Sequence, residues 1–599
     1  MSGSRAHKYA ESPVLKLSMP PWRSRFLLVL LVSGMLLLIA RAFQLQVLEA
    51  EFLNREGESR YLREMSIEAS RGRIFDREGN VLAVSTPVRS IWAVPSDVNA
   101  TPAQIQEIAK LLGQTPAELK RKLASDKRFV FLARQIAPET ADRVSAMKIA
   151  GVFQDKEFRR FYPGAELSAH LVGFTGVDGK GLEGIELALQ ADLTGVDGAR
   201  TVIRNRRGEI VEDVGLRKPA RDGRDVALAL DSKIQYIAYT QLRQAVTEHR
   251  AKAGSVVVLD ARNGEVLALA NWPTYNPNNR QGLSGSALRN RAVTDTFEPG
   301  STLKPFTVAL ALEKGRYRFN SRIDTTPGRL TIGRATISDA KPHGVLTVAE
   351  VLQKSSNVGT AMMAADLPSR DMWTMYDALG FGKPPALGFP GEVGGRLRAW
   401  NGWRPIEKAT MSYGHGISMS LVQLARSYTV FGNGGRLLPL SLLKRDYQAS
   451  IGTPLLAPQA AREVLAMLEM AVQDGGTAPK ARIPGYRVAG KTGTAHKLEG
   501  GSYANKYVAS FVGLAPVSSP RLIVALMIDE PSAGKYYGGD VAAPVFAGIM
   551  EASLRSLGVM PDLTRLQATA RSTPPPATPE APAREAQVAA ANLTVERQL

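Results

Sequence analysis

Residues 255–270 read SVVVLDARNGEVLALA, and this stretch decides the fold. Two apolar runs flank Asn263-Gly264, which is the strongest short signal for a β-hairpin. Three further strand candidates are YRVAGKTGTA (486–495), KYVASFVGLAP (506–516) and RLIVALMID (521–529). Their short connections predict antiparallel neighbours. Helical patterns fill the sequence between the two groups of strands, so we predict one sheet assembled from distant segments and packed on helices over residues 224–556.

Directly before the hairpin, residues 224–230 (RDVALAL) alternate like a strand and lead into a helical pattern over 233–246. After it, residues 297–306 read FEPGSTLKPF. Pro299-Gly300 breaks the chain, so a helix should begin at Ser301. Ser301 and Lys304 then lie on the same face, where the amine can reach the hydroxyl. A lysine desolvated by apolar neighbours can act as a base, and the free N–H groups of the helix start favour an oxyanion.

The Ser-x-x-Lys spacing alone has little weight, because it occurs five times in this chain. Taken singly, Ser301 reads as a helix-capping serine with a solvated lysine. Two other motifs each occur once: Ser355-Ser356-Asn357 and Lys491-Thr492-Gly493-Thr494. Their order along the chain is the one found in penicillin-binding proteins and class A β-lactamases.

Each of these motifs has a chemical use. Lys-Thr-Gly on an edge strand offers a cation and hydroxyls to a carboxylate, and Gly493 lets a substrate pair closely as an added strand. The Ser355 hydroxyl can pass a proton, and the Asn357 amide can bind a carbonyl. The competing interpretations are a helix cap for Ser355 and an ordinary strand residue for Thr492.

With these motifs in place, the chain resembles the class B penicillin-binding proteins, and within them the cell-division D,D-transpeptidases. The segments that carry the resemblance, besides the three motifs, are RGRIFDREGN (71–80), GLEGIE (181–186) and AGKYYGGDVAAPVF (533–546). The resemblance implies an α/β (α+β) penicillin-binding transpeptidase domain with a mainly antiparallel sheet. It also implies an N-terminal α+β pedestal and a single transmembrane helix.

The resemblance further assigns roles to residues. Ser301 would attack the penultimate D-Ala of a peptidoglycan stem peptide with Lys304 as base, and Ser355 and Lys491 would assist proton transfer. Asn357 would hold the acyl-side amide, while Thr492, Gly493 and Thr494 would form the substrate-binding strand. The N–H groups of Ser301 and Thr494 would form the oxyanion hole. β-Lactams would acylate Ser301, and the glycan polymerase FtsW with other division proteins would be partners.

The predicted pedestal covers residues 49–223. Strand-like runs at 81–84 and 90–94 accompany helical patterns at 103–113 and 116–125, each of which follows a Thr-Pro start signal. The resemblance implies a structural ion network at Arg71, Arg73 and Asp76, and we expect pairing there rather than catalysis.

A membrane segment is predicted at 26–48. Residues 26–40 are uncharged, and Arg41 can extend its guanidinium to the interface. The basic residues of segment 1–25 predict a cytoplasmic N-terminus, which places the remainder outside the cytoplasm, on the periplasmic face of the inner membrane. The alternative is a signal peptide cleaved near 40–42, although Arg41 disfavours that site.

Composition sets the remaining limits. Lys+Arg 75 against Asp+Glu 56 gives a net charge of +19, which favours an anionic partner, and export argues against nucleic acid. No cysteine is present and the six histidines are scattered, so we expect no metal and no cofactor. Residues 557–599 form a Pro/Ala-rich tail without apolar periodicity, which predicts disorder.

Three alternatives to a septal transpeptidase stay open at this stage. A β-lactam hydrolase needs a base for deacylation, and no Glu-x-x-Leu-Asn segment occurs. A non-catalytic scaffold or β-lactam sensor would not need complete motifs. An elongation-type transpeptidase would share all of the motifs, because only the resemblance points to division.

Overall fold

The computed structural model describes residues 21–52, 62–204, 210–445 and 451–563. Most of the predicted segment 1–25 and of the predicted tail 557–599 lies outside these residues. The chain forms two compact units. The first comprises Met1–Ala69, Arg89–Lys156 and Val196–Arg221, and the second comprises Ser70–Val88, Glu157–Gly195 and Asp222–Leu599.

The first unit begins with an apolar helix, α1 (Pro21–Phe43), extended by the π-helical turn η2 (Gln44–Leu48). The span Pro21–Leu48 has a mean hydropathy of 2.5 in its most apolar window, and none of that window is buried. It is long and apolar enough to cross a membrane. The described helix already includes Pro21, ahead of the predicted 26–48.

The rest of the first unit is an α+β fold. A three-stranded antiparallel sheet has the order β1 (Leu62–Ile67), β6 (Gly198–Arg204), β7 (Ile210–Lys218). The two predicted helices are confirmed as α3 (Pro102–Leu111) and α4 (Pro116–Leu123), each with a Thr capping box. The other elements are η3 (Pro95–Asp97), β4 (Val130–Ile136) and α5 (Pro138–Ala146).

The strands predicted at 81–84 and 90–94 are one strand, β3 (Val81–Ala93), so their separation was wrong. Its start pairs with β2 (Ile74–Phe75) and its end, from Arg89, pairs with β4. Pro87 lies between the stretches that pair with β2 and with β4. β5 (Val152–Phe161) also pairs with β3.

In the second unit, the predicted strand 224–230 is reduced to β8 (Val226–Ala227), which pairs in parallel with β2. The short helices nearby are η4 (Ala165–Leu167), α6 (Ala169–Val172), α7 (Gly184–Ala188) and α8 (Gln190–Leu193). Arg71 forms a buried ion pair with Glu186 at 2.6 Å, whereas Arg73 pairs with Asp225 at the surface, also at 2.6 Å. Asp76 instead accepts hydrogen bonds, from Ser232 and Asn80 among others. The predicted network is therefore three separate structural contacts.

The main sheet confirms the predicted assembly from distant segments. Its strands are β9 (Ala253–Asp260), β10 (Val266–Trp272), β17 (Ala489–Glu499), β18 (Ser502–Ala515) and β19 (Leu522–Asp529). The order is β10-β9-β19-β18-β17, and every pairing is antiparallel. β17 is an edge strand, because it pairs only with β18.

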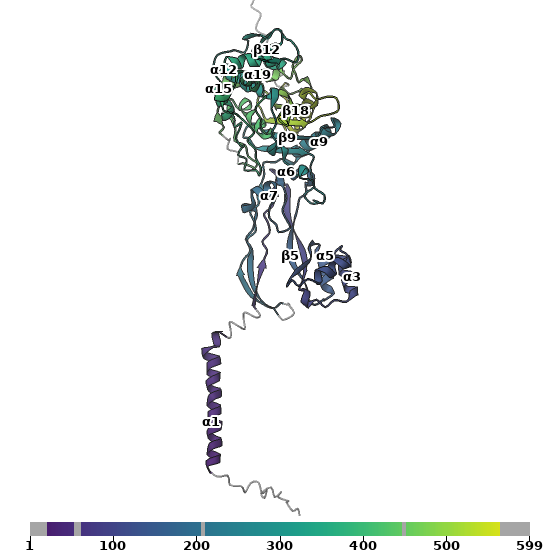
Figure 1. Cartoon of the computed structure of the whole chain (residues 1–599), viewed down its shortest axis with the longest axis vertical. Coiled ribbons are helices and arrows are strands. Elements are labelled where there is room, and N and C mark those ends of the chain that lie inside the picture. The colour runs from purple at the N-terminus through teal and green to yellow at the C-terminus, as the bar shows by residue number, and fades with distance from the viewer. Residues whose placement is uncertain (1–20, 53–61, 205–209, 446–450, 564–599) are drawn as a thin grey trace, which may run out of the picture. The chain divides into compact units, whose positions relative to one another are not determined.

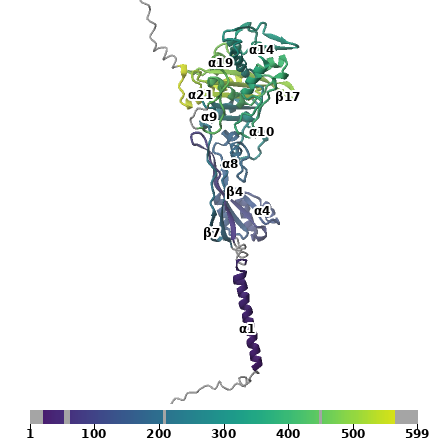
Figure 2. The same ribbon diagram turned by 90° about the vertical axis from the view of Figure 1, so that its left-hand side faces the viewer.

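Both faces of this sheet are covered by helices. Val256 and Val258 of β9 pack in a core cluster with α9 (Ser232–Glu248) and α21 (Ala543–Ser556). Val257 and Leu259 face the opposite cluster, which contains α12 (Lys304–Glu313) and α17 (Leu421–Ser427). Figure 1 shows α9 beside β9, and Figure 2 shows α21 beside α9. A strand buried on both faces reads as a continuous apolar run, as this one does.

The helical side carries the remaining elements of the site. They are η5 (Gly300–Leu303), α13 (Val348–Lys354), α14 (Asn357–Ala365) and the hairpin β12 (Arg329–Ile332)–β13 (Ala335–Ser338). Other elements are α10 (Gly285–Leu288), α11 (Arg291–Thr294), β11 (Arg322–Asp324), β14 (Val345–Thr347), α15 (Ser369–Ala378), η6 (Trp400–Gly402), α16 (Pro405–Met411), α18 (Thr429–Gly432), β15 (Arg436–Leu437), β16 (Thr453–Pro454), α19 (Pro458–Met470), η7 (Pro479–Ala481) and α20 (Gly538–Val541).

Candidate active site

Ser301 lies on the 3-10 turn η5, directly before α12. Residues three apart eclipse one another in a 3-10 turn, so Ser301 and Lys304 lie on one side, as predicted. Two glycines let other backbone segments approach this turn. A Cβ at Gly414 would lie 2.1 Å from the carbonyl oxygen of Gly300, and one at Gly493 would lie 2.9 Å from that of Pro299. The turn is therefore clamped between a loop and β17.

Two lysine side chains beneath the turn are fully buried, those of Lys304 and Lys491. Their Nζ atoms lie 3.2 Å and 2.9 Å from the same atom, Ser355 Oγ. Burial, together with the charge of Lys491, lowers the pKa of Lys304 well below its usual value, against an opposing effect of Asp339. Burial lowers the pKa of Lys491 to about 7. The lowered pKa of Lys304 favours the uncharged amine, which is the form that can accept a proton.

Ser355 occupies the left-handed region (φ 60°, ψ 39°) at the C-terminal end of α13. The sequence allowed a helix cap here, and Ser355 is indeed the C-cap of α13. The N-terminal cap of α14 is its neighbour Ser356, which accepts from Gly359 N. Left-handed backbone is costly for a non-glycine residue and often marks functional sites. Asn357 directs Oδ1 to Lys304 Nζ at 2.7 Å and donates from Nδ2 to Ser338 O at 3.0 Å.

Asp339 holds the turn between α13 and α14, and the sequence analysis missed it. Its carboxylate accepts from Ser356 Oγ at 2.6 Å, Asn357 N at 2.5 Å and Val358 N at 3.0 Å. Asp339 belongs to one of the four other Ser-x-x-Lys matches, 338–341. That segment contributes to the site through its carboxylate and through the carbonyl of Ser338 rather than through a serine hydroxyl.

The Lys-Thr-Gly motif lies on β17, as predicted, and the free edge of this strand borders the cleft. Thr492 Oγ1 donates to Thr477 Oγ1 at 3.1 Å, and Thr494 Oγ1 accepts from Gly538 N at 3.0 Å. A free strand edge can accept a substrate backbone as an additional strand. Thr477 adds a further hydroxyl to this wall, and no motif pointed to it.

These elements enclose a cleft of about 770 Å³. Five of the predicted site residues line it: Ser301, Ser355, Asn357, Thr492 and Thr494. Lys304 and Lys491 lie buried and reach Ser355 from within, and Gly493 packs without a side chain against Ser510. The cleft also has an aromatic wall, made by the stacked Tyr507 and Tyr536 with Tyr537 and His496.

A serine hydroxyl, two buried amines that share a second hydroxyl, and an adjacent strand edge together have the composition of a serine acyl-transfer site. Comparison with known proteins agrees with this class. Residues 254–551 match the penicillin binding protein transpeptidase domain, and residues 66–228 match the penicillin-binding protein dimerisation domain.

Similar proteins cover almost the whole chain. A probable peptidoglycan D,D-transpeptidase PenA of Neisseria gonorrhoeae is 44% identical over 92% of this chain and 95% of its own length. The peptidoglycan D,D-transpeptidase FtsI of Escherichia coli K12 is 41% identical over 90% and 93%. The apo structure of the TP domain of Burkholderia pseudomallei penicillin-binding protein 3 is 47% identical, with a TM-score of 0.52 over 56% of this chain and 97% of that chain. The chain belongs to the class B penicillin-binding proteins and is a peptidoglycan D,D-transpeptidase.

Proposed function

We propose that this protein cross-links peptidoglycan stem peptides at the division septum through an acyl-enzyme on Ser301. The observation that carries the proposal is the position of Ser355 Oγ between Lys304 Nζ and Lys491 Nζ, in a cleft that Ser301 also lines. Ser301 Oγ forms no hydrogen bond to another described residue. Catalytic hydrogen bonds often form only in the substrate complex.

In the first half-reaction, Ser301 Oγ attacks the carbonyl carbon of the penultimate D-Ala, and its proton passes to Lys304 Nζ. The bond to the terminal D-Ala breaks, and the leaving amine takes a proton through the Ser355 hydroxyl. The N–H groups of Ser301 and Thr494 hold the oxyanion. Such an arrangement contributes most when the donors are fixed before the reaction.

In the second half-reaction, an amine of a neighbouring stem peptide attacks the ester and restores the Ser301 hydroxyl. Asn357 binds the acyl-side amide throughout, and Thr492 and Thr494 bind the terminal carboxylate before it leaves. Burial lowers the pKa of Lys491 to about 7. The amine of Lys491, next to Ser355 Oγ, can therefore gain or lose a proton near neutral pH. A β-lactam enters the same first step, because its strained amide occupies the place of the D-Ala–D-Ala bond.

The cellular placement is part of the proposal. The span Pro21–Leu48 supports a single-pass inner-membrane anchor. The N-terminus then lies in the cytoplasm, and the pedestal and the transpeptidase domain lie in the periplasm. Similarity to FtsI supports the division septum. The glycan polymerase FtsW is the partner that the resemblance to the division enzymes implies. A fluorescent fusion should form a band at midcell, whereas patches along the lateral wall would assign the protein to elongation.

Labelling with a fluorescent penicillin tests the nucleophile. The full chain in detergent should be labelled at Ser301, and Ser301→Ala should abolish labelling. Ser145→Ala is the matched control, because Ser145 begins another Ser-x-x-Lys match and lies exposed in the other compact unit. Labelling that survives in Ser301→Ala would reject Ser301 as the nucleophile. Turnover of the label within seconds would indicate a hydrolase.

A further inference from the structure

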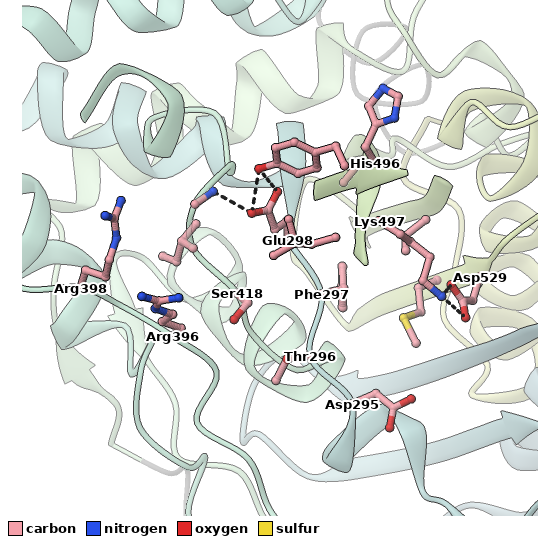
Figure 3. A pocket seen from close by; sticks show the side chains of 17 residues that line it. Asp295, Thr296, Phe297, Glu298, Arg396, Arg398, Ser418, His496, Lys497 and Asp529 are labelled. Atoms are coloured by element: carbon pink, nitrogen blue, oxygen red, sulfur yellow. Dashed lines mark hydrogen bonds and ion pairs between the residues drawn. The ribbon is translucent and has the colours of Figure 1, made fainter. Parts of the chain in front are cut away.

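Two cavities border the nucleophile turn. One is the cleft, and the other, shown in Figure 3, contains Glu298 and shares His496 with the cleft. A third cavity, of about 410 Å³, lies instead in the first compact unit, at the strand β4. Basic and aromatic side chains line it, and neither the motifs nor the proposed function uses them.

An aromatic face lies beside this cavity. Ile91 and Ala93 of β3 pack in the core that α3, α4 and α5 cover, so Trp92 between them points to the opposite face of the sheet. Trp92 is paired with Phe131 of β4, and its ring lies 5.1 Å from that of Phe129. The rings of Phe129 and Phe131 lie 4.7 Å apart and are 42% and 38% exposed. Two phenyl rings at the cavity are therefore open to solvent.

Polar contacts hold these rings in place. Trp92 Nε1 donates to Asp155 Oδ2 at 2.7 Å, which sets the orientation of the indole. The guanidinium of Arg134 lies over the ring of Phe131, at 4.7 Å from its centre. A platform that is fixed in advance loses little conformational entropy when a ligand binds.

Two cations at the cavity have no counter-charge. Lys122 is already occupied, because its Nζ donates to Gln114 Oε1 at 3.0 Å and to Leu132 O at 2.7 Å. Arg121 and Lys127 are exposed, and neither side chain forms a hydrogen bond or an ion pair with another residue that the structure describes. The C-terminal end of α4 favours a cation at Arg121, but Lys127 lies beyond this helix.

The rings and the cations together define the ligand. Segment 120–134 contains six basic residues and one acid, so the ligand should be anionic, as the net charge of the chain also predicts. Flat faces of C–H groups pack against the π faces of aromatic rings, and carboxylates pair with arginine and lysine. Peptidoglycan, on which the similar enzymes act, has both features. Its glycan chains consist of pyranose rings, and its stem peptides carry carboxylates.

We propose that this face of the pedestal binds a glycan chain of peptidoglycan, separately from the catalytic cleft. Sugar rings pack on Phe129 and Phe131, and carboxylates of the stem peptides pair with Arg121 and Lys127. Such a site tethers the enzyme to the polymer that it modifies, and it raises the effective concentration of stem peptides at the cleft.

Cosedimentation with purified peptidoglycan sacculi tests the proposal on the full chain in detergent. Ser301 is first acylated with benzylpenicillin, so that the cleft does not contribute. Phe129→Ala should raise the amount of sacculi needed for half-maximal binding about tenfold, a typical loss for an aromatic residue at the centre of an interface. The double variant Arg121→Gln with Lys127→Gln should bind at least about fivefold more weakly and depend less on salt.

Two matched controls should keep native binding. Phe161→Ala removes a ring that is 41% exposed at the end of β5, outside the cavity. Lys110→Gln removes an exposed cation from the last turn of α3, the counterpart of Arg121 in α4. A fluorescent penicillin should label Ser301 at the native rate in every variant, because none of these changes touches the cleft.

Equal binding of sacculi by the native protein, Phe129→Ala and the double variant would overturn the proposal, and unchanged labelling of Ser301 would leave the proposed function intact. Competition then identifies the ligand. Soluble glycan fragments with intact stem peptides should displace the native protein from sacculi, and polyglutamate at equal carboxylate concentration should do so at least about tenfold less well. Equal displacement by polyglutamate would assign the face to an acidic protein segment, and the glycan assignment would be wrong.

Discussion

Removal of the Asp339 carboxylate should impair both stability and acylation. It accepts three hydrogen bonds at the start of α14, and bonds to a charged group are worth ~1.5–3 kcal/mol each. The group is partly exposed and its bonds are not additive, so we expect Asp339→Ala to lower the free energy of unfolding by about 3 kcal/mol. If the whole of this loss, about 3 kcal/mol, also raises the activation free energy of acylation through the turn that carries Ser355 and Asn357, acylation slows by up to about 100-fold.

The assay is the second-order rate of labelling by a fluorescent penicillin, measured across pH beside thermal denaturation. Burial and the charge of Lys491 lower the pKa of Lys304, while Asp339 raises it. Loss of Asp339 therefore lowers this pKa further, and the acid limb of the rate profile should move to lower pH. Asp324→Ala is the control, because Asp324 is exposed and accepts from Thr326 N in a turn outside the cleft. A labelling rate within twofold of native in Asp339→Ala would refute the reasoning.

Two further predictions concern the buried lysine and the clamped turn. The folded-state pKa of Lys491 is about 7 against an ordinary value of 10.5, so the unfolded chain binds more protons between these values and stability should rise with pH there, by ~1.4 kcal/mol per pH unit. Denaturant titrations at pH 7, 8 and 9 should show a shallower rise in Lys491→Met, and equal slopes would contradict the assignment. Gly414→Ala would place a Cβ 2.1 Å from Gly300 O at a positive φ of 90°, so labelling of Ser301 should fall by more than about tenfold. Gly402→Ala, which meets open space, should label normally, and a normal rate in Gly414→Ala would show that the turn is not clamped.

Local patterns predicted the sheet and the ends of several helices well. The Asn263-Gly264 hairpin and the helix starts after Thr101 and Thr115 all depend on residues close in sequence. The division of β3 into two strands was wrong, because the residues between the two apolar runs, Pro87 among them, continue the strand.

The sequence predicted the motif residues of the candidate site, but it did not predict the residues that hold them in position. Lys304, Ser355 and Lys491 were chosen from the three motifs and their order along the chain, and the structure brings their amine and hydroxyl groups together. Asp339 and Thr477 carry no local signal, since they act through contacts with residues 17 and 15 positions away.

The left-handed backbone at Ser355 sets a limit on how this enzyme can be improved. Helices commonly end in this conformation at glycine, which adopts it without steric cost. Glycine at 355 would relax the chain there and delete the oxygen that both amines share. Thermal stability and catalytic turnover therefore impose opposite demands at this position. A selection for thermal stability alone would favour glycine at this position and remove the hydroxyl that the reaction uses.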